Sequence, residues 1–196
     1  MQKHLSILLM KKVTEVTEDN YDAVKWALTG GSKGFDTETT GVGHDDRPFL
    51  LTVAKEDEVF AYWLDTFKVP ESILDGTLYS HNLKFDYKML TKIGYKVAGR
   101  FHCTMVAERL LRNDRLPKEY NLEETAKRYG MEKDKRVDAY IKEHGLFEVQ
   151  EDGEKKVKVP RFDRVPRPLM LEYAGHDAWL HLQIGLKQEV LLETTV

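Results

Sequence analysis

The sequence is poor in cysteine and has no apolar run long enough to span a membrane. Its single cysteine, Cys103, excludes an internal disulfide framework and a cysteine-based zinc cluster, and it fits a reducing compartment. The early apolar run from Leu5 to Met10 is far shorter than a membrane span, and no small-residue cleavage site follows it. We therefore expect a cytoplasmic protein with no membrane partner.

The chain also lacks an overall basic excess. Charged residues make up 32% of it, but the formal net charge is only −3. Any nucleic acid would therefore be held by local patches and metal ions rather than by total charge. With 196 residues, 41% of them hydrophobic, the chain is long enough for one substantial core and short for two. No internal repeat or low-complexity segment occurs, so we predict a single domain over residues 1–196.

Apolar periodicity predicts helices and strands that alternate along the chain. Strands are expected at residues 13–16, 34–43, 50–54, 59–64 and 77–80, the second, third and fourth forming a meander. Helices are expected at residues 17–28, 71–74, 83–93, 104–112, 122–129 and 169–192, with Thr17 capping the first. Trp26, Trp63 and Trp179 fit amphipathic faces and are predicted to lie in the core. The histidines show no ligand spacing.

Residues 133–168 are expected to be irregular, except for one hairpin. The segment LFEVQEDGEKKVKVP has alternating apolar residues, Phe147 and Val149 opposite Val157 and Val159, around the turn Asp152-Gly153. This pattern predicts a β-hairpin insertion at about residues 146–160. The densest basic stretch of the chain lies in and after it: Lys155, Lys156, Lys158, Arg161, Arg164 and Arg167. It is either a solvated hairpin face or a flap that touches a phosphate backbone.

The stretch GFDTETTGVG places Asp36 and Glu38 on either side of one threonine. Residues two apart on a strand point to the same face, so these carboxylates should lie side by side. Like charges so placed raise each other's pKa unless a positive charge lies between them, which makes a divalent cation the obvious candidate. The alternative is a strand end that runs into a polar turn.

Two further pairs carry groups that suit the same chemistry. In SHNLKFDYKML, Asn82 and Asp86 lie four apart where a strand gives way to a helix, although such residues are also typical helix caps. In LEYAGHDAWLHL, Tyr173 and Asp177 lie four apart on one face of the last helix. By itself this pair is more typical of a core tyrosine beside a surface aspartate.

Taken in order, the three pairs resemble the motifs of the DEDD superfamily of 3′-5′ exonucleases, in the variant whose third motif carries tyrosine. The variant with histidine would have it at Glu172. The segments FDTETTGV, HNLKFDYKML, FHCTMVAERLL, NLEETAKRYG and EYAGHDAWLHLQIGL are similar to the proofreading domain of family A, polymerase I-like, DNA polymerases, over about residues 13–192. Those polymerases often have aspartate at Cys103, so Thr104 would have to cap the following helix.

The resemblance implies an α/β fold: a ribonuclease H-like mixed β-sheet flanked by α-helices, with the carboxylates at one end. It also implies two Mg²⁺ or Mn²⁺ ions, which suit hard oxygen ligands. Asp36 would bridge both ions, Glu38 and Asp177 would complete the site of the ion that activates water, and Asp86 would hold the second ion, partly through water. Tyr173 would orient the attacking water, since a phenol is a poor base at neutral pH.

The same resemblance implies contacts to the terminal nucleotide. Thr39 and Thr40 would offer hydroxyl or backbone donors. Val42 would wedge against the terminal base or, alternatively, anchor its own loop. Asn82 would support the substrate or the site geometry, and Phe85 would contact the substrate.

Three functions remain open. The first is a metal-dependent exonuclease that acts on the 3′ end of single-stranded DNA and releases nucleoside 5′-monophosphates, in a bacterial or phage-infected cell. It would be free-standing or associated with a DNA polymerase domain or subunit. The second is an RNA-trimming enzyme that resembles ribonuclease D. The third is an inactive domain that binds strands or a polymerase, which the intact carboxylate set disfavours.

Overall fold

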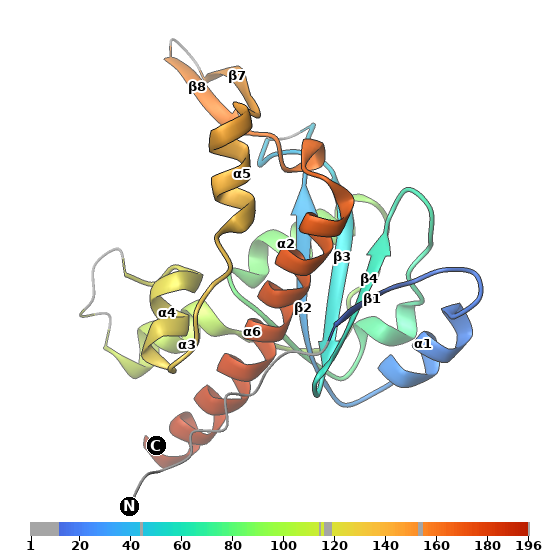
Figure 1. Ribbon diagram of the computed structural model, residues 1–196. Coiled ribbons are helices and arrows are strands. Elements are labelled where there is room, and N and C mark those ends of the chain that lie inside the picture. The colour runs from blue at the N-terminus through green and yellow to red at the C-terminus, as the bar shows by residue number, and fades with distance from the viewer. Residues whose placement is uncertain (1–11, 44, 114, 116–118, 153–154, 196) are drawn as a thin grey trace, which may run out of the picture.

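The protein forms a six-stranded mixed sheet with helices on both faces (Figure 1). The computed structural model describes residues 12–43, 45–113, 115, 119–152 and 155–195, so the apolar run from Leu5 to Met10 lies outside it. The strand order is β1-β4-β3-β2-β5-β6. The strands are β1 (Val13–Glu15), β2 (Ser32–Thr39), β3 (Pro48–Lys55), β4 (Glu58–Trp63), β5 (Thr77–Ser80) and β6 (Arg100–Cys103). A mixed sheet flanked by helices confirms the expected α/β fold class.

The meander β2-β3-β4 is antiparallel, as expected, while β1, β5 and β6 pair in parallel with their neighbours. β6 was not predicted. It is a four-residue edge strand with exposed and half-buried side chains, so it lacks the burial alternation that makes a strand visible in sequence.

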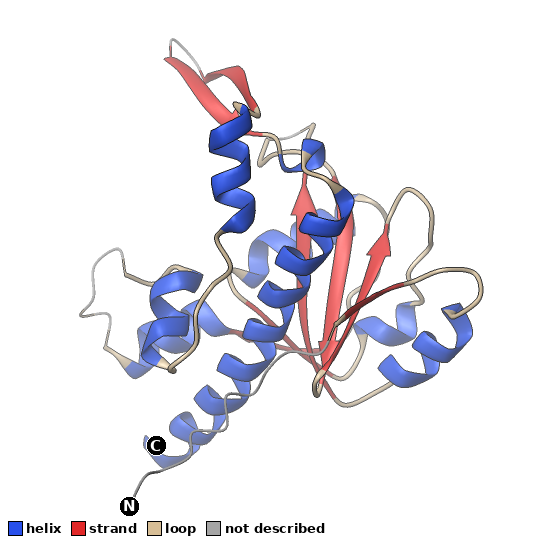
Figure 2. Cartoon of the chain, viewed as in Figure 1, coloured by secondary structure: helices blue, strands red, loops and turns tan. Residues whose placement is uncertain are grey.

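Two hydrophobic clusters lie on opposite faces of the sheet. One packs under α1 (Tyr21–Leu28), the 3₁₀ helix η1 (Glu71–Leu74) and α2 (Leu83–Lys92). The other packs under α4 (Leu122–Arg128), α5 (Arg136–His144) and the long α6 (Arg167–Thr195), and α3 (Thr104–Leu111) packs on α6. Figure 2 shows these helices around the strands. No helix in the described ranges is long and apolar enough to cross a membrane.

Three helical predictions were wrong. α1 begins at Tyr21 rather than after Thr17, because the Asn20 side chain closes a turn by accepting a hydrogen bond from the Thr17 N–H at 2.8 Å. α5 occupies part of the segment expected to be irregular. It buries only Val137 and Ile141, too narrow an apolar stripe to stand out in a charged sequence. Trp26 is 79% exposed rather than in the core, because α1 turns its other face inward.

Helix α6 lies against β2 with almost no side chain between the two backbones. A Cβ atom on Gly34 would lie 2.1 Å from the Ala178 carbonyl oxygen and 2.7 Å from the Leu182 nitrogen, so only glycine fits. The Thr52 hydroxyl donates to the Ala174 carbonyl at 2.9 Å, and His181 Nδ1 donates to the carbonyl of Phe35 at 2.8 Å. Because Thr52 belongs to β3, these contacts fix where α6 crosses both β2 and β3.

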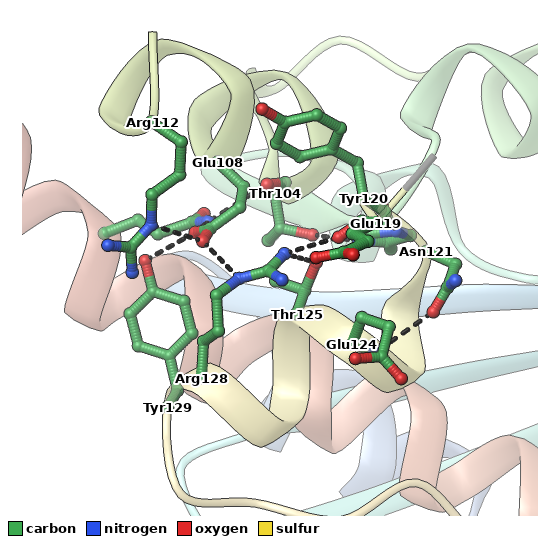
Figure 3. Close-up of polar contacts among 12 residues, drawn as sticks. Thr104, Glu108, Arg112, Glu119, Tyr120, Asn121, Glu124, Thr125, Arg128 and Tyr129 are labelled. Carbon is green, nitrogen blue, oxygen red and sulfur yellow. Dashed lines mark hydrogen bonds and ion pairs between the residues drawn. The ribbon is translucent and has the colours of Figure 1, made fainter. Parts of the chain in front are cut away.

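A buried carboxylate ties α3, α4 and α6 together (Figure 3). Glu108 accepts hydrogen bonds from Arg112 Nε at 3.1 Å, Arg128 Nε at 2.8 Å, the Tyr129 hydroxyl at 2.7 Å and Gln188 Nε2 at 3.0 Å. Burial alone would raise the pKa of Glu108, but these donors outweigh it and the pKa is lowered. The network therefore holds α4, and the connection that follows it, against α6.

The predicted hairpin is present as β7 (Phe147–Asp152) and β8 (Lys155–Pro160), which project from the body of the fold (Figure 1). Its turn at residues 153–154 lies outside the described ranges. The register was wrong by one residue. Val149 is paired with Lys158 and Gln150 with Val157, so the valines of the two strands lie on opposite faces.

Replacing Gly34 with alanine should destabilise the fold and disturb the spacing between β2 and α6. The new methyl group meets backbone atoms that cannot rotate away, so we expect a loss of roughly 1–3 kcal/mol or more in the free energy of unfolding, measured by urea titration. Gly30→Ala is the control for the clash: its own backbone strain at φ +65° should cost about 1 kcal/mol, but a Cβ atom there meets no atom within 4 Å. The control should keep any metal-induced rise in melting temperature, and Gly34→Ala should lose most of it. An unchanged response in Gly34→Ala would contradict this packing constraint.

Candidate active site

Three carboxylates meet between β2 and α6. Asp36 and Glu38 lie on the face of β2 that also carries Gly34, and Asp177 precedes the Ala178 whose carbonyl touches that glycine. One oxygen from each of Asp36, Glu38 and Asp177 lies within 4.8 Å of the other two. Glu38 and Asp177 are buried, at 8% and 5% exposure.

This donor set fits a divalent cation. Asp177 Oδ1 is fully buried and accepts no hydrogen bond from the described part of the chain, which leaves a ligand oxygen free. Three carboxylates of hard oxygen character suit Mg²⁺ or Mn²⁺ better than a soft metal. The acidic cluster expected from the sequence is therefore present.

Asp86 reaches the same region from α2, through the gap where β2 and β5 separate. Their pairing ends at Gly34, so the Thr37 N–H lies beyond the ladder. Asp86 Oδ1 accepts from this N–H at 3.1 Å and from the Thr37 hydroxyl at 2.6 Å, while Oδ2 accepts from the Ser80 hydroxyl. Asp86 lies near enough to raise the pKa of Asp36, but its oxygens do not join the three that converge.

Tyr173 lies one turn before Asp177 on α6, and a lysine joins the two. Lys133 Nζ donates to the Tyr173 hydroxyl oxygen at 2.9 Å and to Asp177 Oδ2 at 2.7 Å. The lysine comes from the connection between α4 and α5, residues 129–135, and the sequence analysis missed it. Nothing in MEKDKR distinguishes Lys133 from Lys135, which pairs instead with Glu123.

Burial and mutual repulsion favour protons on the cluster. The pKa of Asp36 is raised well above its ordinary range. Burial is the largest cause, and the negative charges of Glu38, Asp86 and Asp177 add to it. Burial and Asp177 raise the pKa of Glu38 to about 8, against the opposing charge of Lys133. Burial raises the pKa values of Asp86 and Asp177 to about 6. A bound cation would reverse these shifts.

The Tyr173 phenol stays protonated. Burial, followed by the charges of Asp177 and Glu38, raises its pKa above the ordinary value. A phenol that keeps its proton cannot serve as a base at neutral pH.

The residues expected to touch substrate are spread around the end of β2. The Thr39 hydroxyl donates to the Gly41 carbonyl at 2.7 Å, and the Thr40 hydroxyl donates to Asp46 Oδ1 at 2.9 Å, so both hydroxyls are engaged within the loop. Val42 is 73% exposed, which does not fit an anchor of its own loop.

On the α2 side, Asn82 is exposed with left-handed backbone angles, φ 62° and ψ 43°, directly before the helix. Phe85 is half-buried one turn along. The expected cap of α3 is absent. The buried Thr104 hydroxyl lies 2.9 Å from His81 Nδ1, and the residue at the cap position, Cys103, makes no side-chain cap hydrogen bond.

A family model described as 3′-5′ exonuclease matches residues 17–193. The chain belongs to the 3′-5′ exonuclease family. This confirms the resemblance drawn from the three motifs and makes the protein a member of a family of hydrolases. The DNA polymerase DpoZ of Salmonella phage PMBT28 is 32% identical over an alignment of 170 positions, which covers 79% of this chain and 25% of that protein.

The DNA polymerase DpoZ of Vibrio phage phiVC8 is 28% identical over an alignment of 200 positions with gaps, which covers 86% of this exonuclease and 31% of the polymerase. The exonuclease thus spans about a quarter to a third of the length of these curated relatives. Among solved structures, Escherichia coli RNase D, an exoribonuclease involved in structured RNA processing, matches with a TM-score of 0.69 and 15% identity. That match covers 95% of this chain and 46% of RNase D, and it shows a shared fold.

Glu38→Gln should stabilise the metal-free exonuclease in a pH-dependent way. A folded pKa of about 8 lies above the ordinary value of 4.5, so the contribution of Glu38 to stability is present at low pH and is lost as pH rises through about 8. Glutamine mimics the protonated form throughout. With chelator present, the variant should gain roughly 1–4 kcal/mol over wild type at pH 8 and about 1 kcal/mol or less at pH 5.

Urea titrations at half-unit pH steps would measure this difference. Wild type and variant share the buried histidines, so these cancel. A gain that did not grow between pH 5 and pH 8 would contradict the charge repulsion described here.

Proposed function

We propose that the protein removes nucleotides from the 3′ end of single-stranded DNA by metal-dependent hydrolysis and releases nucleoside 5′-monophosphates. The observation that carries the proposal is the convergence of oxygens from Asp36, Glu38 and Asp177 beside the Tyr173 hydroxyl, in a chain of the 3′-5′ exonuclease family. Hydrolysis of a terminal phosphodiester needs an activated water and a stabilised leaving oxygen. Two divalent ions, when bound, supply both.

The position of each carboxylate indicates which of the two ions it would bind. The charges of Glu38, Asp86 and Asp177 all raise the pKa of Asp36, so Asp36 lies near all three carboxylates. This central position supports a role for Asp36 as the ligand shared by both ions. Glu38 and Asp177 would complete one ion's set. Asp86, whose oxygens are engaged by Thr37 and Ser80, would serve the second ion partly through water.

Tyr173 would hold the attacking water in place. Its raised pKa keeps the phenol protonated, so it can donate a hydrogen bond but does not remove a proton. Val42, exposed beyond the end of β2, would pack against the terminal base as a wedge. The backbone N–H of Thr40 already donates to the Arg47 carbonyl at 3.1 Å, so the backbone N–H of Thr39, with Asn82 and Phe85, would complete the contacts to the last nucleotide.

DNA is favoured as the substrate because both curated relatives are phage DNA polymerases. We therefore also propose that the chain works beside a polymerase, as a proofreading activity in a phage-infected cell. RNA trimming is the second candidate, supported by the fold shared with the exoribonuclease RNase D. Digestion of 3′- and 5′-end-labelled DNA and RNA strands of equal sequence, with Mg²⁺, Mn²⁺ or chelator, separates the two. Faster digestion of RNA, or digestion that chelator does not stop, would refute the proposal.

Asp36→Ala should lower the digestion rate by several orders of magnitude, because a shared ligand organises both ions. Tyr173→Phe should lose about tenfold to a thousandfold, since one positioning hydrogen bond is lost while the metal ligands remain. Glu58→Ala, at an exposed carboxylate at the start of β4, should digest like wild type. Single-turnover rates on a labelled strand measure all three. Equal losses in Asp36→Ala and Tyr173→Phe would assign the phenol an essential chemical role instead.

The basic hairpin offers a test of strand contact. Arg161 is held by Glu148 and Asp163, and Arg167 stacks on Trp63, so the test of phosphate contact uses the lysines of β8. If they bind phosphates, replacing Lys155, Lys156 and Lys158 with serine should weaken strand binding and reduce its salt dependence, because fewer counterions are released. Fluorescence anisotropy over a salt series measures both. Unchanged affinity and slope would identify a solvated hairpin face.

A further inference from the structure

Lys133 is a cation placed inside a cluster of acids, and it lies outside the three motifs quoted from the sequence. Its side chain is only 16% exposed, and its ammonium lies within hydrogen-bond distance of Tyr173 and Asp177. The ammonium also lies 4.0 Å from the centre of the Tyr173 ring. A buried ammonium is costly unless it is paired, so these contacts hold it in place.

The backbone that carries Lys133 is itself fastened to α6. The Asp134 N–H donates to His176 Nδ1 at 3.3 Å, and Arg136 Nη1 donates to Glu172 Oε2 at 2.7 Å. The Arg136 guanidinium also donates hydrogen bonds to both carboxylate oxygens of Asp134. The connection therefore touches α6 at successive positions around Tyr173 and Asp177, and the lysine reaches the site from a fixed base.

The direction of the hydrogen bonds matters for the reaction. An ammonium has only donors, so Lys133 occupies a lone pair of the Tyr173 oxygen and leaves the phenol O–H to donate elsewhere. On Asp177 it takes Oδ2, while Oδ1 accepts no hydrogen bond from the described part of the chain. Lys133 thus orients both groups without using the oxygen that is free to bind a cation.

We propose that Lys133 is a positioning residue of the exonuclease reaction, which aims the Tyr173 O–H and holds Asp177 from outside the metal-ligand set. The inference rests on the proposed function, because the effect on kcat that it predicts requires exonuclease activity. It makes two demands: loss of Lys133 must slow the chemical step through Tyr173, and it must not weaken metal binding, because the lysine is not a ligand and its charge opposes that of a cation.

The test compares Lys133→Met, which keeps the length of the side chain and removes its charge, with the control Lys135→Met. Lys135 lies on the same connection but is 61% exposed and pairs with Glu123. Lys133→Met should lower kcat on a labelled DNA strand by about tenfold to a thousandfold with KM changed by about threefold or less, and Lys135→Met should match wild type. Calorimetric titration should show that Lys133→Met binds Mn²⁺ at least as tightly as wild type.

A double-mutant cycle shows whether the lysine acts through the phenol. In the Tyr173→Phe background, Lys133→Met should cost much less than it costs in wild type, because the hydroxyl that it aims is already gone. Full additivity of the two losses, wild-type kcat in Lys133→Met, or weaker Mn²⁺ binding would each overturn the proposal. If wild type digested neither DNA nor RNA, the proposed function would fail and the inference would fail with it, whereas an active wild type with an equally active Lys133→Met variant would overturn the inference alone.

Discussion

The direct contact between the backbones of α6 and β2 is the constraint on which the site depends. Gly34 lets the Ala178 carbonyl approach the strand where any side chain would block it. Asp177 is the neighbour of Ala178, and Asp36 follows Gly34 on the same face, so the separation of these carboxylates is set by backbone packing. Hydrogen bonds from Thr52 and His181 keep the helix from sliding along the strand. A site on a strand and a helix so joined is more rigid than one built on loops.

The same contact imposes an electrostatic cost. It brings buried carboxylates together, and burial and repulsion raise their pKa values. Lys133 offsets part of the charge, but one ammonium does not balance Asp36, Glu38 and Asp177. A divalent cation would relieve the remaining repulsion and add ligand bonds, so the arrangement that the fold holds would become favourable on binding metal. The buried Glu108 network contributes indirectly, because it fastens α4 and hence the connection that carries Lys133.

Sequence patterns predicted the features that rest on local geometry. Two-residue and four-residue spacings placed Asp36 with Glu38, and Tyr173 with Asp177, each pair on one face. Periodicity does not predict which face of the sheet α6 covers. That the strand pair and the helix pair would lie close together was therefore expected only from the family resemblance. β6 and α5 escaped prediction because an exposed edge strand and a helix with two buried residues leave weak patterns. Lys133 could not be found, since its partners lie 40 and 44 residues away along the chain.

The most direct measurement is an anomalous-difference map from crystals of the wild-type protein soaked in Mn²⁺. A peak between β2 and α6, within about 2.0–2.3 Å of oxygens of Asp36, Glu38 and Asp177, is the result that the packing of α6 on β2 predicts. It should disappear in Asp36→Ala crystals grown in the same form. Manganese bound only to exposed carboxylates elsewhere on the surface, with the three oxygens still within 4.8 Å of one another, would contradict the assignment of this cluster as the metal site.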